Sequence, residues 1–512
     1  MPPTSFSVVR GSVAATALLE DDGVDALAVA LAPAGEGDDG AQPRAGATDA
    51  AVRYGIDLPD LADRHDATGA AGEVRTVHLP RALAGGGALP WAGLPSRLLL
   101  VGIGSGGPED LRRSGAALAR ATQGLRRVVT TVGSDAGPDG VRALVEGFVL
   151  GAYRHPSRAT APSPPAPPAE VVLLGRHAEA AVTAAVTAAH ATCTARALTV
   201  EPSDTKTPAW LADRAVALAR AAGLETEVLD EDALRAGGFG GVLAVGGGSA
   251  SPPRLVTVRY TPAETSRTAR HVVVVGKGIT YDTGGISIKP RESMVAMKTD
   301  MAGAAVALAT VLGAAAAGVR HRVTAVLPLA ENAVGASAYR PGDVLRLYDG
   351  TTVEIGNTDA EGRIVLADAL AYADARLEPD VLVDVATLTG AATLGLGRQH
   401  GALYTSDDRL ARGLEAAGLE AGERLWRMPL VPEYAEAIRS QVADVRQVPV
   451  DGWTGGGSIT AALFLQRFAG ARRWAHLDIA GPARATAAAH EVPEGATGFG
   501  VRVLMRWLGQ LR

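Results

Sequence analysis

Short, almost uninterrupted runs of apolar residues recur through the C-terminal half of the chain, and helical segments separate them. A β-strand that is apolar on both faces must be covered by other elements on both sides. Alternation of such strands with helices is typical of a mostly parallel sheet flanked by helices. The pattern therefore predicts an α/β fold with central strands at residues 271–275, 323–327, 381–385 and 474–479.

The N-terminal part of the chain shows the same alternation on a smaller scale. Apolar runs at residues 97–103, 127–132 and 170–174 are typical of buried strands. Residues 109–122 and 140–152 have the spacing of helices that cover a sheet. This part of the chain is therefore expected to form an α/β unit of its own.

A proline-rich segment separates the two series. Residues 156–168 read PSRATAPSPPAPP and should be extended and exposed. An alanine-rich helix is predicted to follow over residues 178–196. We therefore expect two domains, each a mostly parallel sheet flanked by helices. The predicted parts are an N-terminal domain over residues 1–175, a linker helix over 176–200 and a C-terminal domain over 201–512.

Charge and composition exclude several classes of protein. The chain has 49 Lys+Arg and 55 Asp+Glu, a formal net charge of −6, so nucleic acid and anionic membranes are not expected partners. Its single cysteine, Cys193, excludes an internal disulfide framework and a cysteine-rich zinc site. We find no apolar run near the roughly 18 residues of a membrane span. Because Glu20 begins an acidic stretch close to the N-terminus, a signal peptide is not expected, and we predict a cytoplasmic protein.

One glycine-rich turn has the form of a nucleotide-binding fingerprint. Residues 102–107 read GIGSGG between a predicted strand and a predicted helix. A dinucleotide fold also needs an acidic residue about 20 positions later, at the end of the second strand. Asp135 comes later than that strand, inside a turn-like segment. An ordinary strand-to-helix turn is the preferred interpretation, and nucleotide binding is the alternative.

Two lysines and two aspartates follow the predicted strand at residues 271–275. Lys277, Asp282, Lys289 and Asp300 are interleaved with glycines and apolar residues. Open α/β sheets bind their ligands in loops at the carboxyl ends of the strands. Charged groups beside an apolar strand end are costly unless they pair or bind a metal. This segment therefore holds candidate ligands.

A second acidic cluster lies in the segment NTDAEGR, residues 357–363. The apolar residues after it recur at helical spacing, so the segment leads into a helix with one buried face. Asp359 and Glu361 are two positions apart, and in an extended segment both carboxylates would project to the same side. Both could then converge on one point.

Three or four carboxylates together with two lysines are typical of a site for divalent cations. Carboxylate oxygens suit such cations, and two ions about 3.5–4 Å apart can share bridging carboxylates. The ten histidines include no H-E-x-x-H motif, so a histidine-rich zinc site is not expected. A lysine beside two cations could have its pKa lowered enough to be a neutral ligand. Ordinary surface salt bridges around a loop are the alternative.

Longer sequence motifs in the C-terminal half resemble those of the leucine aminopeptidase (cytosol aminopeptidase) family of the bacterial type. They include VGKGITYDTGGISIKP, MKTDMAGAA, NTDAEGR, ATLTGA and WAHLDIAGPA, in that order between residues 206 and 483. NTDAEGR is the family's signature. The resemblance implies a metallo-exopeptidase that hydrolyses the N-terminal residue from peptides, with leucine-like residues preferred. The catalytic domain would be residues 201–512.

The resemblance also implies a ligand set for two divalent metal ions per subunit, zinc or manganese, with magnesium or cobalt possible. The tighter metal site would use Lys277, Asp282, Asp300 and Glu361. The more exchangeable site would use Asp282, Asp359 and Glu361, so that Asp282 and Glu361 bridge the two ions. The two catalytic residues that bind no metal would be Lys289 and Arg363. The substrate-binding residues would be Met297, Thr387 and Gly390.

The implied mechanism uses a water that bridges the two metal ions as the nucleophile. Lys289 would stabilise the oxyanion, and Arg363 would hold a bicarbonate ion that relays the proton. Peptide substrates and a homohexamer are the implied partners. Three alternatives are a nucleotide-dependent enzyme, a DNA-binding protein and a catalytically silent relative. His476 and Asp478, in an apolar strand, are expected to be a satisfied buried pair.

Overall fold

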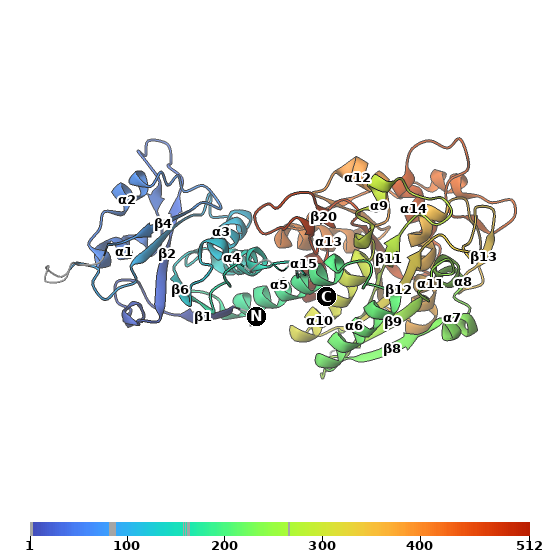
Figure 1. The fold of residues 1–512 in the computed structure, drawn as a ribbon, viewed down its shortest axis with the longest axis horizontal. Coiled ribbons are helices and arrows are strands. Elements are labelled where there is room, and N and C mark those ends of the chain that lie inside the picture. Colours follow the sequence, from blue (N-terminus) through green and yellow to red (C-terminus); the bar gives the residue numbers. More distant parts are fainter. Residues whose placement is uncertain (1–3, 81–88, 157, 159, 161–163, 265–266) are drawn as a thin grey trace. The chain divides into compact units, whose positions relative to one another are not determined.

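The computed structural model describes residues 4–512 except 81–88, 157, 159, 161–163 and 265–266. It divides into two units (Figure 1). The N-terminal unit comprises Met1–His190 and Ala487–Pro493, and the C-terminal unit comprises Ala191–Thr486 and Glu494–Arg512. Helix α5 (Glu179–Val200) runs from the first unit into the second.

A mostly parallel sheet forms the centre of the N-terminal unit. Its strands lie in the order β1-β7-β6-β2-β5-β4, with β3 paired to β2. All neighbouring pairs are parallel except β4 with β5 and β3 with β2. The three predicted strands are confirmed as β5, β6 and β7. The bounds are β1 (Ser5–Val9), β2 (Val24–Ala32), β3 (Gln42–Pro43), β4 (Val74–His78), β5 (Arg97–Gly102), β6 (Arg127–Thr130) and β7 (Glu170–Leu174).

Helices cover both faces of this sheet. The two predicted helices are confirmed as α3 (Pro108–Ala121) and α4 (Gly137–Ala152), and they pack in one cluster with the first part of α5, whereas α1 (Ala47–Tyr54) and α2 (Leu58–Arg64) pack in the other. Helices α3 and α4 pack backbone against backbone. A Cβ at Gly115 would lie 2.0 Å from the Leu144 carbonyl oxygen, and one at Gly147 would lie 2.0 Å from the Arg112 carbonyl oxygen.

The glycine-rich turn at residues 102–107 is closed by a side chain of its own helix. One carboxylate oxygen of Asp110 accepts hydrogen bonds from the Ser105 backbone N–H at 2.9 Å and from its hydroxyl at 2.7 Å. A Cβ at Gly104 would lie 2.6 Å from that oxygen. The carboxylate therefore occupies the place at the helix N-terminus where a phosphate would bind. This favours the ordinary turn over the nucleotide site.

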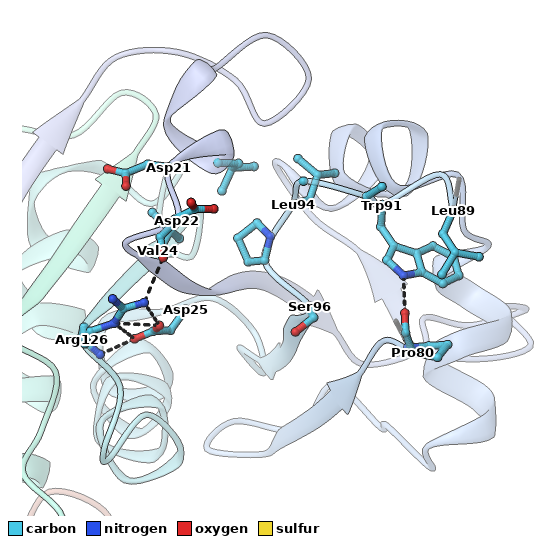
Figure 2. Close-up of a pocket in the computed structure, with 14 residues that line it drawn as sticks. Asp21, Asp22, Val24, Asp25, Pro80, Leu89, Trp91, Leu94, Ser96 and Arg126 are labelled. Carbon is cyan, nitrogen blue, oxygen red and sulfur yellow. Dashed lines mark hydrogen bonds and ion pairs between the residues drawn. The ribbon is translucent and has the colours of Figure 1, made fainter. Parts of the chain in front are cut away.

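A cavity of about 430 Å³ lies beside the start of β2 in the N-terminal unit (Figure 2). Three of its four charged side chains already form ion pairs, Asp25 with Arg126 and Asp21 with Arg127. The Arg126 guanidinium lies 2.8 Å from Asp25 and donates to the Asp22 carbonyl oxygen at 2.9 Å. On the opposite wall, the Trp91 indole N–H donates to the Pro80 carbonyl oxygen at 2.8 Å. The cavity therefore does not present a cluster of unpaired ligands.

The region between the two predicted series is described only in part. Of the predicted extended segment 156–168, residues 157, 159 and 161–163 lie outside the described residues. At its end, the Pro164 and Pro165 carbonyl oxygens accept hydrogen bonds of 2.7 Å from Arg154. The alanine-rich helix predicted over residues 178–196 is confirmed as α5, which continues to Val200.

The main sheet of the C-terminal unit has the strand order β17-β16-β19-β15-β10-β12-β9-β8, with β11 paired to β12. The four predicted strands are the central neighbours β19, β15, β10 and β12, and they are all parallel. Antiparallel pairing occurs at β8, β9 and β16. The bounds are β8 (Glu225–Leu229), β9 (Arg254–Tyr260), β10 (His271–Gly276), β11 (Gly278–Asp282), β12 (Arg322–Asn332), β15 (Val381–Ala386), β16 (Gly401–Tyr404), β17 (Leu425–Arg427) and β19 (Arg473–Asp478).

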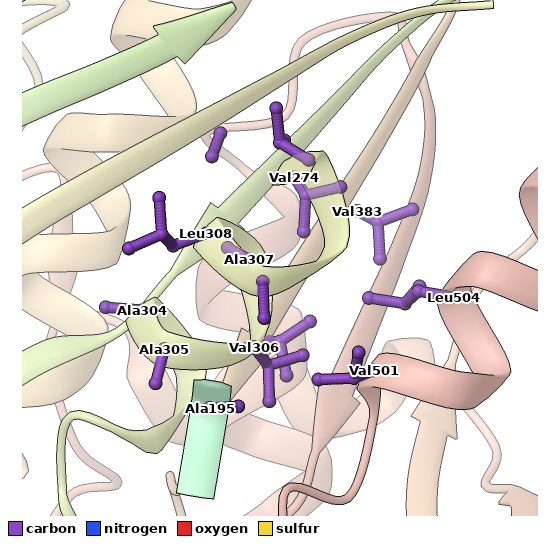
Figure 3. Packing of buried hydrophobic residues seen from close by; sticks show 14 of the residues in the cluster. Ala195, Val274, Ala304, Ala305, Val306, Ala307, Leu308, Val383, Val501 and Leu504 are labelled. Atoms are coloured by element: carbon purple, nitrogen blue, oxygen red, sulfur yellow. The ribbon is translucent and has the colours of Figure 1, made fainter. Parts of the chain in front are cut away.

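Both faces of this sheet are buried, as the apolar runs predicted. Val272 and Val274 of β10 pack in one hydrophobic cluster with α10, whereas Val273 and Val275 pack in another with α11. Figure 3 shows residues of α10 packing against Val274 and Val383 of the strands and against Val501 and Leu504 of α15. The helices are α6 (Pro208–Ala221), α7 (Glu231–Gly237), α8 (Gly240–Gly246), α9 (Arg291–Met294), α10 (Ala302–Ala316), α11 (Glu361–Tyr372), α12 (Gly390–Leu396), α13 (Asp408–Ala421), α14 (Gly457–Gln466) and α15 (Val501–Gln510).

Two small sheets complete the C-terminal unit. One has the order β13-β14-β18, and the other pairs β20 with β21. Their bounds are β13 (Val344–Arg346), β14 (Thr352–Glu354), β18 (Val445–Arg446), β20 (Arg484–Ala485) and β21 (Gly495–Ala496). The parallel pair β14 and β18 brings residues near 354 beside residues near 446.

One apolar helical stretch is longer than the sequence analysis recognised. By length and composition, Arg291–Ala316 could cross a membrane, so the statement that no run approaches this length is wrong. The stretch consists largely of alanine and other small residues. Its most apolar window is 83% buried inside the protein. Its C-terminal part, α10, is therefore a buried helix that packs in the core of the C-terminal unit (Figure 3).

Candidate metal centre

The carboxyl ends of neighbouring strands bring predicted site residues to one edge of the main sheet. Lys277 follows β10 directly, and Asp282 is the last residue of β11, in register with Asn332 at the end of β12. Thr387 follows β15, and Asp478 is the last residue of β19. Parallel strands of an open α/β sheet form their ligand site at this edge.

A close approach of helix α10 to the strands brings Asp300 to the same edge. The 3-10 turn η2 (Met297–Thr299) precedes Asp300, and α10 begins at Ala302. A Cβ at Gly303 would lie 2.1 Å from the Val385 carbonyl oxygen and 2.8 Å from the backbone nitrogen of Lys277. Only a glycine allows the first turn of the helix to lie directly on the strand ends.

The second acidic cluster lies on a turn, so the prediction of an extended segment is wrong. The Asn357 side chain accepts a hydrogen bond of 2.8 Å from the Asp359 backbone N–H and starts the 3-10 turn η3 (Thr358–Ala360). Glu361 is the first residue of α11. An asparagine that bonds to the backbone two residues later favours such a turn. The two carboxylates still converge, but by a different route.

Lys277 joins two acidic residues that are far apart in the sequence. Its ammonium group lies 2.8 Å from Asp300 and 2.9 Å from Glu361, and it donates to the Thr387 carbonyl oxygen at 3.0 Å. The side chain is buried. Gly362 allows this contact, because a Cβ there would lie 2.4 Å from Lys277 Cε.

Lys289 makes a second bridge between the two clusters. Its ammonium group lies 2.8 Å from Asp282 and also forms an ion pair with Asp359. Asp282 itself accepts hydrogen bonds of 2.8 Å from the Gly284 N–H and from the Asn332 side-chain amide. All five predicted metal ligands and Lys289 therefore take part in ion pairs, in two groups of three: Lys277 with Asp300 and Glu361, and Lys289 with Asp282 and Asp359.

The carboxylates have the spacing of a metal-binding group. One oxygen from each of Asp282, Asp359 and Glu361 lies within 4.8 Å of the other two. Glu361 is 1% exposed, yet its Oε2 has no hydrogen-bond partner among the described residues. A buried carboxylate oxygen without a partner is costly unless a cation binds it. The donor set therefore fits a divalent metal ion.

The electrostatics of the network follow from burial and from like charges in contact. Burial, the Asp282 charge and the other acids raise the pKa of Glu361, and burial raises the pKa of Asp300. Burial also raises the pKa of Asp359. Burial opposes the charge of Lys277, but Asp300 and Glu361 outweigh it and raise the pKa of this amine well above its ordinary value. Crowded carboxylates of this kind need protons, lysines or metal ions beside them.

Arg363 lies in the first turn of α11, and its guanidinium bonds to a backbone carbonyl group. Its Nη1 donates to the Gln447 carbonyl oxygen at 2.9 Å. Burial lowers the pKa of Arg363 to about 10. The Nε–H is buried and has no hydrogen-bond partner among the described residues. Such a donor fits an anion.

Three buried polar residues that the sequence analysis did not select support the acidic loop. The Asn332 side-chain amide and the Tyr339 hydroxyl both donate to the Thr358 carbonyl oxygen, at 3.0 and 2.9 Å. Gln447 holds the opposite flank of the loop through its side-chain amide. Asn332 and Tyr339 lie in the word ENAVGASAY, whereas Gln447 has no charge or motif that marks it.

The predicted substrate-binding residues have different relations to the cluster. The Thr387 hydroxyl donates to Asp300 Oδ1 at 2.8 Å. The Met297 carbonyl oxygen accepts from the Asp300 N–H at 3.1 Å, and the Met297 side chain is half-buried. Gly390 is the exposed first residue of α12 and, within the described part of the chain, makes no hydrogen bond to the carboxylate cluster.

His476 and Asp478 are buried and bonded, but each to other partners. His476 Nδ1 lies 2.5 Å from Asp384, which also accepts from the Trp474 indole N–H at 2.8 Å. Asp478 accepts from the backbone N–H groups of Leu388 and Thr389 at 3.1 and 3.0 Å. The expected pair is therefore replaced by two separate contacts, and Asp478 holds the segment before α12.

The fold and the site together define a class of protein. A parallel α/β sheet carries at its carboxyl edge a cluster of buried carboxylates and lysines suited to divalent metal ions, which is typical of metal-dependent hydrolases. Comparison with protein families identifies the family within this class. Residues 193–505 match the catalytic domain of the cytosol aminopeptidase family, and residues 28–157 match its N-terminal domain. The chain belongs to this family and is a metallo-aminopeptidase.

Individual relatives agree with the family match over most of the chain. A probable cytosol aminopeptidase of Streptomyces avermitilis is 41% identical over 94% of this chain and 95% of its own, and one of Nocardia farcinica is 44% identical over 87% of both chains. Among solved structures, the bottromycin maturation enzyme BotP in complex with Mn is 38% identical, with a TM-score of 0.80 over 95% of this chain and 99% of its own. A tomato leucine aminopeptidase mutant is 28% identical, with a TM-score of 0.83 over 100% of this chain and 97% of its own.

Proposed function

We propose that this aminopeptidase uses two divalent metal ions to hydrolyse the N-terminal residue from peptides, with leucine-like residues preferred. The convergence of Asp282, Asp359 and Glu361 within 4.8 Å carries the proposal. Membership of a metal-dependent family and the manganese complex of a relative support it. In the proposal, residues 201–512 carry catalysis, after a linker helix over 176–200 and an N-terminal domain over 1–175.

The contacts support two overlapping ligand sets. The first is Lys277, Asp282, Asp300 and Glu361. The second is Asp282, Asp359 and Glu361. Zinc or manganese is the proposed metal, with magnesium or cobalt as substitutes, because carboxylates and an amine can bind all of these ions. When bound, two such ions would polarise the scissile carbonyl and acidify a bridging water that acts as nucleophile.

Lys289 has the position and the charge to stabilise a developing oxyanion. Asp282 and Asp359 outweigh its partial burial and raise the pKa of the amine, so it stays protonated at neutral pH. A fixed ammonium group in a partly buried site stabilises negative charge more than water does. Lys277, in contrast, must give up its proton to serve as a ligand.

Arg363 is the proposed holder of a bicarbonate ion that relays the proton. Its buried Nε–H without a protein partner supports this role. The planar guanidinium can form a bidentate pair with a planar anion, which a lysine cannot. Arg363 donates to Gln447 at 2.9 Å, so its orientation does not depend on the carboxylate cluster.

Met297, Thr387 and Gly390 are the proposed substrate-binding residues. Met297 would offer an apolar wall for the side chain of the first residue. An apolar pocket distinguishes side chains by only about 1–3 kcal/mol per methylene, so the preference for leucine should be graded. We also propose a homohexamer in the cytoplasm, which size-exclusion chromatography with light scattering tests for the assembly.

The direct test is hydrolysis of leucine p-nitroanilide before and after chelation. Dialysis against a chelator should abolish turnover, and added Mn²⁺ or Zn²⁺ should restore it. Glu361→Gln should lower both bound metal and turnover, because it removes one of the two carboxylates shared by both ligand sets. Glu292→Gln, an exposed position just before the site, is the matched control. Full activity after thorough chelation would refute the two-metal proposal.

A further inference from the structure

We propose that Gln447 is a positioning residue that sets the geometry of Asp359, Glu361 and Arg363 together. It is the residue after β18 and is 0% exposed. It lies about 90 positions from the acidic loop in the sequence, yet both its side chain and its carbonyl group bond to the segment 356–363. The inference rests on the proposed metal-binding role of Asp359 and Glu361.

The side-chain amide of Gln447 spans the acidic loop. Its Oε1 accepts hydrogen bonds of 3.2 Å from the backbone N–H groups of Gly356 and Asn357. Its Nε2 donates to the Ala360 carbonyl oxygen at 2.9 Å. The three contacts enclose Thr358 and Asp359 and end at the residue before Glu361. Only a side chain with both an acceptor and donors can make this set.

The backbone of Gln447 fixes Arg363 and is itself anchored. Its carbonyl oxygen accepts from Arg363 Nη1 at 2.9 Å, and its N–H donates to the Glu354 carbonyl oxygen at 2.9 Å. The parallel pairing of β14 with β18 leads directly into this contact. A Cβ at Gly356 would lie 2.6 Å from Val448 Cγ2, so the two segments touch. One rigid residue therefore holds the loop and the arginine at a fixed separation.

This arrangement has a functional consequence. Asn332 and Tyr339 hold the loop at Thr358, on the side of Asp282, while Gln447 holds Gly356, Asn357 and Ala360. Without the amide, two backbone N–H groups and one carbonyl group in a partly buried loop lose a partner. The loop would then relax, and Asp359 would move relative to Asp282. Groups that orient metal ligands in this way typically change metal affinity about 10- to 100-fold when removed.

The test compares metal binding in three full-length variants. Gln447→Met keeps the side-chain length but removes the donor and the acceptor. Gln441→Met makes the same exchange at an exposed position of the same segment. Asp359→Asn tests the ligand itself. Chelator-treated proteins are titrated with Mn²⁺, the bound ion is measured by electron paramagnetic resonance, and unfolding of the same samples is followed without metal.

We expect Gln447→Met to weaken binding of one of the two Mn²⁺ ions about 10- to 100-fold, together with a lower thermal midpoint of the chelator-treated protein because the loop loses three hydrogen bonds. Gln441→Met should match wild type in both Mn²⁺ affinity and thermal midpoint. A purely structural role would lower the midpoint and leave Mn²⁺ affinity unchanged in the folded fraction. Wild-type affinity in Gln447→Met, with weakened binding in Asp359→Asn, would overturn the positioning role alone. Unchanged binding in Asp359→Asn would instead overturn the proposed ligand set.

A measurement on the wild-type protein covers the case in which Gln447→Met does not fold. The hydrogen bonds to Oε1 should slow hydrogen exchange of the Gly356 and Asn357 amides, without metal as well as with it. Protection of both amides in the chelator-treated protein supports their hydrogen bonds to Gln447 Oε1. Exchange of both at the rate of an unstructured chain would overturn it.

Discussion

Metal binding at Lys277 should release a proton, and the number of protons released measures whether this lysine is a ligand. Its ammonium group lies 2.8 Å from Asp300 and 2.9 Å from Glu361. These carboxylates outweigh burial and raise the pKa of the amine well above its ordinary value. An amine binds a metal only after it has lost its proton. At pH 7.5 the lysine alone should therefore release about one proton per tightly bound ion.

The sign and size of the pH dependence of metal affinity follow from the pKa of Lys277. A lysine with an ordinary pKa of about 10.4 costs about 4 kcal/mol to deprotonate at pH 7.5, and a raised pKa increases that cost. Protons compete with the metal, so the affinity should rise about tenfold for each unit of increasing pH. The raised pKa of Glu361 adds to the slope at the lower end of the range, where this carboxyl group is also protonated before metal binds.

Isothermal titration calorimetry measures the number of protons released when the metal binds. Mn²⁺ is added to chelator-treated protein in two buffers that differ in ionisation enthalpy, and the difference in heat gives the protons released. Lys277→Met should release about one proton fewer than wild type. Lys298→Met, on the turn η2 where Lys298 donates to the Val200 carbonyl oxygen at 2.8 Å, should release the same number as wild type. No proton release by the wild-type protein would refute lysine coordination.

Other substitutions test other parts of the site. Arg363→Ala should lower turnover of leucine p-nitroanilide at unchanged metal content, and Arg363→Lys should not restore it, because an ammonium group cannot form the bidentate pair; loss of metal by mass spectrometry would contradict this. Gly362→Ala should weaken Mn²⁺ binding, because its Cβ would lie 2.4 Å from Lys277 Cε; wild-type affinity would show that the lysine can shift at no cost. Gly303→Ala, with a Cβ 2.1 Å from the Val385 carbonyl oxygen, should lower the free energy of unfolding in urea by about 1–3 kcal/mol; an unchanged midpoint would argue against the close approach.

The central strands could be predicted because valine-rich runs buried on both faces have few other interpretations. Strand β2 (Val24–Ala32) is buried just as fully, but four of its nine residues, VDALAVALA, are alanine. Alanine favours helices and is depleted in strands, so the sequence gives no β signal there. For the same reason the sequence analysis missed the apolar stretch that ends in α10, because its alanines and glycines are each only weakly hydrophobic. Antiparallel edge strands such as β8, with its exposed and charged residues, carry even less signal.

The charged residues of the site could be predicted, but the residues that support them could not. Asp282 stands out because it interrupts an apolar and glycine-rich segment, and Asp359 and Glu361 stand out because they lie together directly before an apolar helix. Gln447 is uncharged and distant in sequence, and its role depends on the pairing of β14 with β18. The geometry predicted for the acidic loop was also wrong. Asp359 and Glu361 are two positions apart, which suggests an extended segment, whereas the Asn357 side chain imposes a turn.

The two lysines explain how so many acidic groups can lie together in this fold. Asp282, Asp300, Asp359 and Glu361 are contributed by three separate segments, and each forms an ion pair with either Lys277 or Lys289. Buried carboxylates repel one another unless cations lie between them. Two ammonium groups balance only part of the charge of four carboxylates, so the cluster retains an attraction for divalent cations. In the proposed ligand set, Lys277 would lose its charge when a metal ion takes over its contacts, while Lys289 would keep its own. The same pair of lysines would then hold the ligands in place and still admit the ions.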